Sequence, residues 1–180
     1  MKIVIAPDSF KGSASSSEIA QWLQSGITSV ISNSDIIKIP IADGGEGSLD
    51  SVITAGFVAH TFTVTGPVGN AVETRIGIKA DTALVELAEA SGLSKLPMNK
   101  LSALTATSHG TGELILRALD LGAKRIILAI GGSACTDAGA GALQALGAHL
   151  RDSEGNEIPR GGAALLNCVT LDTSELDSRL

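Results

Sequence analysis

The chain has 180 residues, of which 13 are Lys or Arg and 19 are Asp or Glu, so its formal net charge at pH 7 is −6. This acidic balance, without a cluster of basic residues, excludes a broad nucleic-acid-binding face, which needs Lys and Arg to neutralise phosphates. Hydrophobic residues make up 44% of the chain and charged residues 18%. That composition excludes a disordered tail protein and suits one large domain or two small ones.

Neither a membrane span nor a secretion signal is expected. The apolar run at the N-terminus, residues 3–6, is too short for the core of a signal peptide, and no stretch approaches the ~18 apolar residues needed to span a bilayer. Cys135 and Cys168 lie far apart without metal-type spacing, which indicates reduced thiols. We therefore predict a cytoplasmic protein with no membrane and no nucleic-acid partner.

The first quarter of the chain alternates predicted strands and helices. The spacing predicts strands over 2–6 and 35–41, each buried on both faces, and helices over 15–31 and 45–54. Pro7 closes the first strand, and Ser15 with Glu18 has the spacing of a capping box at the start of the first helix. Strand, helix, strand, helix is typical of a parallel sheet with crossover helices.

The turn residues at 65–70 form the predicted domain boundary, with a first domain over 1–68 and a second over 69–180. Beyond it, the pattern predicts strands over 72–79, 82–88 and 125–130 and helices over 111–121 and 139–146. Gly122 is a good left-handed cap for the first of these helices. Glu86, at the end of an apolar strand, is a candidate buried acid.

Two strand-to-helix junctions carry carboxylates. Asp8 follows the first strand and Asp43 the second, and the carboxyl ends of parallel strands meet at one edge of a sheet. With Lys11 close by, these residues suit metal-assisted phosphoryl transfer: the carboxylates hold Mg²⁺ or accept a hydroxyl proton, and the ammonium offsets phosphate charge. Asp is also favoured in turns and caps, so a structural role for both stays open.

Two glycine-rich loops could bring backbone amides close to an anion. Gly44 and Gly45 precede Glu46 in the second junction, and residues 131–133 lie between the strand over 125–130 and a helix. The chain contains no GxxxxGK[ST], which excludes a Walker A loop. Nor does the loop at 131–141 match GxGxxG, which argues against a dinucleotide site there.

Two further segments offer binding groups. Asp137 could ligate a metal that bridges phosphates, or could simply cap the helix that follows it. Ser108 and Thr111 offer hydroxyls beside the permissive Gly110, and His109 lies between them. His60 and His149 are interpreted as bystanders, because a lone histidine is usually structural.

Six blocks of the chain, in order, resemble the bacterial glycerate kinase family. They are PDSFKGS at 7–13, IPIADGGEGS at 39–48, VTGPVGN at 64–70, ELAEASGL at 86–93, TSHGTGELI at 107–115 and AIGGSACTDAGAGALQALG at 129–147. The resemblance implies ATP-dependent phosphorylation of D-glycerate to phosphoglycerate, commonly at the 2-hydroxyl, with Mg²⁺. It also implies an α/β fold of two domains around a cleft, with a parallel Rossmann-like sheet in the first and a mixed α/β second domain.

On this basis the sequence predicts a site with ATP and Mg²⁺ as cofactors, D-glycerate and ATP as small-molecule partners, and a homodimer as one option. The predicted catalytic residues are Asp8, Lys11 and Asp43, and the predicted metal ligand is Asp137. The predicted substrate- and phosphate-binding residues are Ser9, Gly44, Gly45, Glu46, Ser108, Gly110, Thr111, Gly131, Gly132 and Ser133.

The chain departs from the family pattern in two ways. Cys135 and Thr136 stand where Thr and Asn are usual, and Ala138 replaces a Gly. Family chains also continue past the point matching Leu180, including a segment that returns to the first domain. We therefore expect little or no kinase activity from these 180 residues alone. A non-catalytic fragment or interaction module is the alternative, and a Rossmann oxidoreductase is disfavoured by the missing dinucleotide fingerprint.

Overall fold

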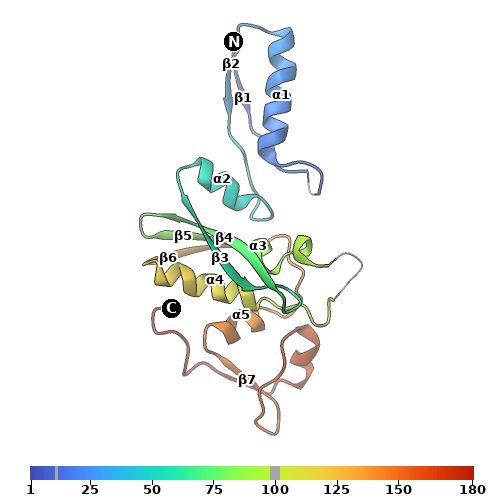
Figure 1. The fold of residues 1–180 in the computed structure, drawn as a ribbon, viewed down its shortest axis with the longest axis vertical. Coiled ribbons are helices and arrows are strands. Elements are labelled where there is room, and N and C mark those ends of the chain that lie inside the picture. Colours follow the sequence, from blue (N-terminus) through green and yellow to red (C-terminus); the bar gives the residue numbers. More distant parts are fainter. Residues whose placement is uncertain (11, 98–101) are drawn as a thin grey trace.

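The computed structural model describes residues 1–10, 12–97 and 102–180. The molecule is elongated, with β1, α1 and β2 at one end, a four-stranded sheet in the middle and β7 at the other end (Figure 1). Its strands are β1 Lys2–Ile5, β2 Asp35–Lys38, β3 Val58–Thr65, β4 Ala71–Lys79, β5 Thr82–Glu86, β6 Arg125–Ala129, β7 His149–Arg151 and β8 Thr170–Asp172. Its helices are α1 Ser16–Val30, α2 Ser48–Thr54, α3 Leu87–Ser91, α4 His109–Asp120 and α5 Ala140–Ala145, with 3₁₀ helices at Leu93–Lys95 and Gly162–Asn167.

The N-terminal unit, formed by β1, α1 and β2, confirms the predicted strand–helix–strand crossover. The two strands are parallel neighbours, with Ile3 opposite Ile36. The capping box at the start of α1 is complete: Ser15 Oγ accepts from the amide of Glu18 at 3.2 Å, and the Glu18 carboxylate accepts from the amide of Ser15 at 2.8 Å. Because the strands are parallel, the loops that follow them leave the same end of the unit.

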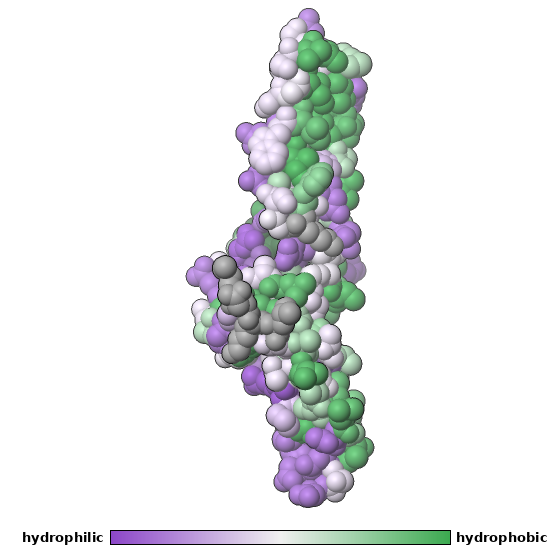
Figure 2. All heavy atoms as spheres, turned by 90° about the vertical axis from the view of Figure 1, so that its right-hand side faces the viewer, coloured by the Kyte–Doolittle hydropathy of each residue, from purple (hydrophilic) through white to green (hydrophobic). Residues whose placement is uncertain are grey.

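The prediction that these strands are buried on both faces is wrong within this chain. Val4 on β1 is 55% exposed, and Trp22 and Val30 on α1 are 61% and 84% exposed. Within the described residues, the unit has two strands and one covering helix, which leaves side chains on its sheet and on its helix exposed. Hydrophobic residues gather on its surface in the side view (Figure 2).

The central sheet has the strand order β3-β4-β5-β6, in which the β5–β6 pair is parallel and the other two pairs are antiparallel. Residues 66–70 form the turn between β3 and β4, so the predicted division at residues 68 and 69 falls within one hairpin. The strand predicted over 82–88 ends at Glu86, because Leu87 begins α3. β3 was not among the strands predicted from the sequence.

The main core lies between the central sheet and α4. It includes Ile76, Val85 and Leu114, which are fully buried. A smaller core, with Leu150 and Ile158, lies beneath β7 and β8. Among the residues that the structure describes, no helix combines the length and apolar character needed to cross a bilayer.

Candidate functional site

The loops after β1 and β2 run side by side as they leave the N-terminal unit. The amide of Ile39 donates to the carbonyl of Ile5 at 2.8 Å, and the amide of Ile41 donates to the carbonyl of Pro7 at 3.1 Å. The parallel ladder therefore continues past the ends of both strands. Asp8 and Asp43 follow directly, which places both predicted carboxylates at the same end of neighbouring strands.

Both carboxylates are exposed, and each accepts a local backbone amide. Asp8 Oδ1 accepts from the amide of Ser9 at 2.7 Å, and Asp43 Oδ1 accepts from the amide of Gly45 at 2.9 Å. These bonds fix each side chain relative to its own loop, as expected for Asp in turns. Lys11, the third predicted catalytic residue, lies outside the described residues.

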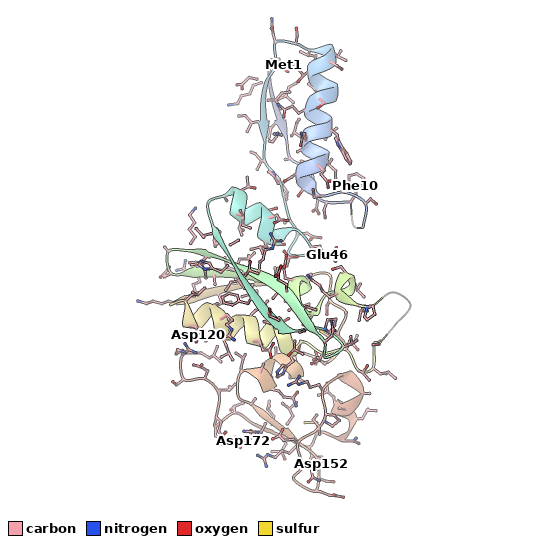
Figure 3. The ribbon with its side chains drawn as sticks, in the orientation of Figure 1. Met1, Phe10, Glu46, Asp120, Asp152 and Asp172 are labelled. Atoms are coloured by element: carbon pink, nitrogen blue, oxygen red, sulfur yellow. The ribbon has the colours of Figure 1, made fainter. Side chains whose placement is uncertain are left out.

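A cavity of about 610 Å³ separates the loop after β1 from α2. Ser9 and Phe10 line it from the first loop, and Glu46 and Gly47 line it from the second. Figure 3 shows Phe10 at the end of the N-terminal unit and Glu46 below it, on the side of the central sheet. The walls of this cavity carry serine hydroxyls and the carboxylates of Glu18, Glu46 and Asp50, which suit a small polar ligand.

The two glycine-rich loops are in direct contact. The amide of Gly131 donates to the carbonyl of Gly44 at 2.8 Å. A Cβ added at Gly131 would lie 2.5 Å from the Cα of Gly45, a distance that no side chain tolerates. One added at Gly45 would lie 3.0 Å from Asp43 Oδ1 and 3.8 Å from the Cα of Gly131. Asp43 and the loop at 131–133 thus border the same glycine.

Two backbone amides in this pair of loops are available to bind an anion. Within the described part of the chain, the amides of Gly132 and Ser133 donate to no carbonyl or side chain. Gly132 has a φ of 73°, and its Cα lies close to Glu46, whose Cγ would be 3.3 Å from an added Cβ. Backbone amides left open beside a positive-φ glycine are the arrangement that cradles phosphate oxygens.

Glu86 lies beneath both loops and confirms the prediction of a buried acid. It is 3% exposed, at the end of β5, opposite Ala129 at the end of β6. Its carboxylate accepts from the amides of Gly47 at 3.2 Å and Leu49 at 2.8 Å. Burial raises the pKa of Glu86, and the two backbone hydrogen bonds oppose that rise.

Asp137, the predicted metal ligand, is 1% exposed and accepts hydrogen bonds through both oxygens. Oδ2 accepts from the amide of Ser108 at 2.8 Å, from its hydroxyl at 2.9 Å and from the amide of Gly141 at 3.1 Å. Oδ1 accepts from the amide of Gly139 at 3.2 Å. The carboxylate therefore joins the first turns of α4 and α5, which is the capping role left open by the sequence.

Ser108, Gly110 and Thr111 lie inside the protein. Ser108 is 2% exposed, and its hydroxyl donates to Asp137 while accepting from the amide of Ala142 at 3.0 Å. Thr111 is 1% exposed and donates to Ser91 Oγ at 3.0 Å. Gly110 packs so tightly that an added Cβ would overlap the carbonyl of Thr65. A phosphate-binding role for these three residues is not supported, because the hydroxyls of Ser108 and Thr111 are buried and already bonded and Gly110 is closely packed.

The glycerate kinase family model matches residues 3–180 of the chain. The chain belongs to the glycerate kinase family. The glycerate 2-kinase of Escherichia coli (strain K12) and the glycerate kinase of Bacillus subtilis (strain 168) are each 50% identical to it over 184 residues, which cover 100% of this chain and 48% of each relative. A crystal structure of a protein assigned as glycerate kinase 2 from Salmonella typhimurium LT2 matches with a TM-score of 0.83 and 46% identity, covering 100% of this chain and 49% of that one. The chain spans about half the length of the curated relatives it matches.

Where the chain departs from the glycerate kinase pattern, its side chains make local bonds. Cys135 Sγ lies 3.0 Å from Ser133 Oγ, and burial raises the pKa of the Cys135 thiol. Thr136 Oγ1 donates to the carbonyl of Ala103 at 2.8 Å. The Ser133 hydroxyl also donates to the carbonyl of Cys135 at 3.0 Å. The side chain of Ser133 thus closes the loop at 131–137, and its amide is the part that stays open.

Magnesium, which membership of the glycerate kinase family implies, does not fit at Asp137. Both oxygens of that carboxylate are already bonded, and the residue is buried. Within residues 1–10, 12–97 and 102–180, no group of three or more His, Cys, Asp or Glu side chains could hold a metal ion. The carboxylate oxygens of Asp8 and Asp43 are ligands of the kind that Mg²⁺ prefers, and both side chains are exposed to solvent.

His109 and Glu113 tie α4 to β3. Glu113 accepts from the amide of Thr65 at 2.6 Å and from its hydroxyl at 2.9 Å, and His109 Nε2 lies 3.5 Å from Glu113 Oε1. Burial, followed by the charge of Arg160, lowers the pKa of His109, and its Nδ1 has no hydrogen-bond partner among the described residues. The histidine is therefore a packed side chain whose charged form is disfavoured by burial.

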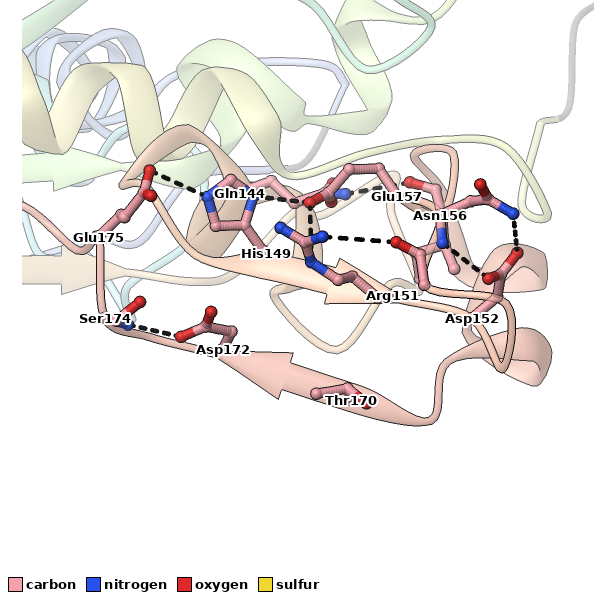
Figure 4. Close-up of polar contacts among 12 residues, drawn as sticks. Gln144, His149, Arg151, Asp152, Asn156, Glu157, Thr170, Asp172, Ser174 and Glu175 are labelled. Atoms are coloured by element: carbon pink, nitrogen blue, oxygen red, sulfur yellow. Dashed lines mark hydrogen bonds and ion pairs between the residues drawn. The ribbon is translucent and has the colours of Figure 1, made fainter.

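His149 forms the centre of a polar network (Figure 4) on β7, which lies at the lower end of the molecule in Figure 1. Its Nδ1 lies 2.6 Å from Glu157, and its Nε2 lies 3.2 Å from Glu175. Hydrogen bonds to Glu175 and Glu157 raise the pKa of His149. The network joins β7 to the segment after β8, which agrees with the interpretation of His149 as a bystander to the candidate site.

Proposed function

We propose that this protein serves the ATP-dependent phosphorylation of D-glycerate, at the 2-hydroxyl, with Mg²⁺. The observation that carries the proposal is the contact between the two glycine-rich loops, at Gly45 and Gly131. Asp43 borders this contact from the first loop, and the open amides of Gly132 and Ser133 follow it in the second. Family membership supports the choice of glycerate over other hydroxy acids. The relatives named glycerate kinase support a phosphoryl acceptor that is an alcohol group.

The chemistry that these residues can supply is positioning and charge neutralisation, which dominate phosphoryl transfer. Amides of Gly132 and Ser133 would hold phosphate oxygens of ATP. Asp43 or Asp8 would accept the proton of the attacking hydroxyl, and Lys11 would pair with a phosphate or with the glycerate carboxylate. Magnesium, held by exposed carboxylates, would neutralise charge on the phosphates when bound.

The cavity beside Ser9 and Glu46 is the candidate pocket for glycerate. Its hydroxyls suit a ligand that carries two hydroxyl groups of its own. We also propose the cytoplasm as the place of the reaction. Cys135 and Cys168 are both unpaired thiols, which fits a reducing compartment.

A non-catalytic fragment is the second candidate function, favoured by two observations. The chain spans about half the length of its curated relatives, and hydrophobic side chains of its N-terminal unit are exposed. Such a fragment would keep the loops and their ligand contacts without completing phosphoryl transfer. An active kinase and a non-catalytic fragment would therefore both bind MgATP and D-glycerate, but only the kinase would turn them over.

The test combines calorimetry with a turnover assay on protein whose intact mass matches the 180 residues. We expect MgATP and D-glycerate each to bind, and ³¹P NMR of any product to give 2-phosphoglycerate. Where turnover occurs, Asp43→Asn is expected to lower kcat by about 100-fold or more with little change in melting temperature. Binding without turnover would favour the fragment, and absence of binding by both ligands would overturn the proposal.

A further inference from the structure

Glu86 occupies the point where three segments of the candidate site meet. Its backbone ends β5 and begins α3, as the residue just before Leu87. Its side chain makes no cap for α3 and turns instead to α2, where it accepts from the amides of Gly47 and Leu49. A buried carboxylate that serves the start of a neighbouring helix, and not of its own, links separate elements.

The loop that Glu86 holds is the one that contacts the phosphate-binding candidate. Gly47 ends that loop, and three residues earlier the carbonyl of Gly44 accepts from the amide of Gly131 at 2.8 Å. On the other side, α3 leads to Leu93, whose amide donates to the carbonyl of Gly132 at 2.9 Å. Glu86 is therefore connected to both sides of the loop at 131–133, through its side chain and through its backbone.

We propose that Glu86 is a positioning residue that holds the loop at 43–47 against the loop at 131–133 and so sets the geometry of the nucleotide phosphates. It acts through the amides of Gly47 and Leu49 and does not touch the ligand itself. The phosphate part of this inference rests on the proposed function. The holding of the loop rests on the hydrogen bonds alone.

The charge of Glu86 matters for this role because a carboxylate accepts through both oxygens, whereas a carboxylic acid keeps one acceptor and becomes a donor at the other. Burial raises its pKa, and the negative charges of Glu89 and Asp50 raise it further. Glu46 and Lys95 face the same small cavity beside it. Protonation on acidification should therefore release one of the two amides and loosen the loop.

The experiment compares Glu86→Gln with Glu89→Gln, a matched variant three residues further along the chain, in α3. Glu89 lines the same small cavity but accepts from the amide and guanidinium of Arg75 and from neither loop. We expect Glu86→Gln to lower hydrogen-exchange protection of the Gly47 and Leu49 amides by about tenfold or more, and to weaken MgATP binding in calorimetry by a similar factor, since an acceptor charge is lost. Glu89→Gln should leave both measurements near the wild-type values.

A pH series separates positioning from a merely structural role. In the wild type, MgATP affinity should fall as the pH drops through the raised pKa of Glu86. In Glu89→Gln the same fall should come at a lower pH, because a charge that raises this pKa is removed, and in Glu86→Gln this component of the pH dependence should be absent. Unchanged protection of Gly47 and Leu49 in Glu86→Gln would overturn the holding of the loop. Lost protection with wild-type MgATP affinity and pH dependence would overturn its role in phosphate geometry. If the wild type binds no MgATP, the proposed function fails, and the exchange data still decide whether Glu86 holds the loop.

Discussion

Replacing Asp137 by Asn distinguishes a helix-capping carboxylate from a metal ligand. The side chain is 1% exposed, and its Oδ2 accepts from Ser108 and Gly141 while its Oδ1 accepts from Gly139. The single carbonyl oxygen of an asparagine can keep the hydrogen bonds from Ser108 and Gly141. Its amide group then faces the N–H of Gly139, so that one acceptor becomes a donor opposite a donor.

The expected cost combines two effects. A hydrogen bond to a charged group contributes about 1.5–3 kcal/mol, and a negative charge at the first turn of a helix contributes about 0.3–1 kcal/mol. We therefore expect Asp137→Asn to lower the free energy of unfolding by about 2–4 kcal/mol. For a chain of 180 residues, this corresponds to a fall in Tm of roughly 5–15 °C.

The assay is urea and thermal unfolding in the presence of EDTA, so that no metal contributes. Asp152→Asn is the matched control, because Asp152 also accepts two backbone amides, those of Glu154 and Asn156 at 2.9 Å each, but is exposed. We expect no measurable change for it. If Asp137→Asn unfolds at the same urea concentration as the wild type in EDTA, and is less stable than the wild type only when Mg²⁺ is added, the capping account is refuted and Asp137 is a metal ligand.

Two further predictions follow from named contacts. The pKa of His149 is raised by its bonds to Glu175 and Glu157, so the ion pairs stabilise fully below the ordinary histidine value of 6.5 and lose effect as the pH rises through the raised pKa. The Tm difference between wild type and His149→Gln should therefore shrink with rising pH in calorimetry, and a difference that grows would contradict this. Gly131→Ala places a Cβ 2.5 Å from the Cα of Gly45 and should separate the two loops. We expect MgATP affinity about tenfold weaker in calorimetry, and unchanged affinity would show that the stacking is not needed.

Features set by neighbouring residues were predicted well. The capping box of Ser15 and Glu18 lies within one turn, so its chemistry is local and readable from spacing. The parallel pairing of β1 and β2 follows from crossover connectivity. Glu86 was identifiable as a buried acid because it ends an apolar run.

Features that depend on residues far apart in the sequence were not predicted. An apolar run such as that around Val4 predicts a strand, but whether the faces of that strand are covered depends on what else packs there. Likewise, Ser108 and Asp137 were proposed to bind a ligand, although they bond to each other across 29 residues. Spacing in the sequence gives no sign of that pairing, and the hydroxyl and carboxylate types suit both roles. The positive φ of Gly132, beside its open amide, is also not readable from the sequence, because a glycine permits that conformation and does not require it.

The same contacts decide where an anion can bind. Helix starts are common sites for phosphate, but four of those in the described part of the chain are already capped: α1 by Ser15, α2 by Glu86, and α4 and α5 jointly by Asp137. A phosphate at any of these ends would have to displace a hydroxyl or approach a carboxylate. The amides of Gly132 and Ser133 cap no helix, since the loop that carries them is held by backbone contacts with Gly44 and Leu93; the carboxylate that a phosphate would approach there is that of Glu46. Capping inside the protein therefore supports our proposal that the loop, and not one of these helix ends, holds the nucleotide phosphates.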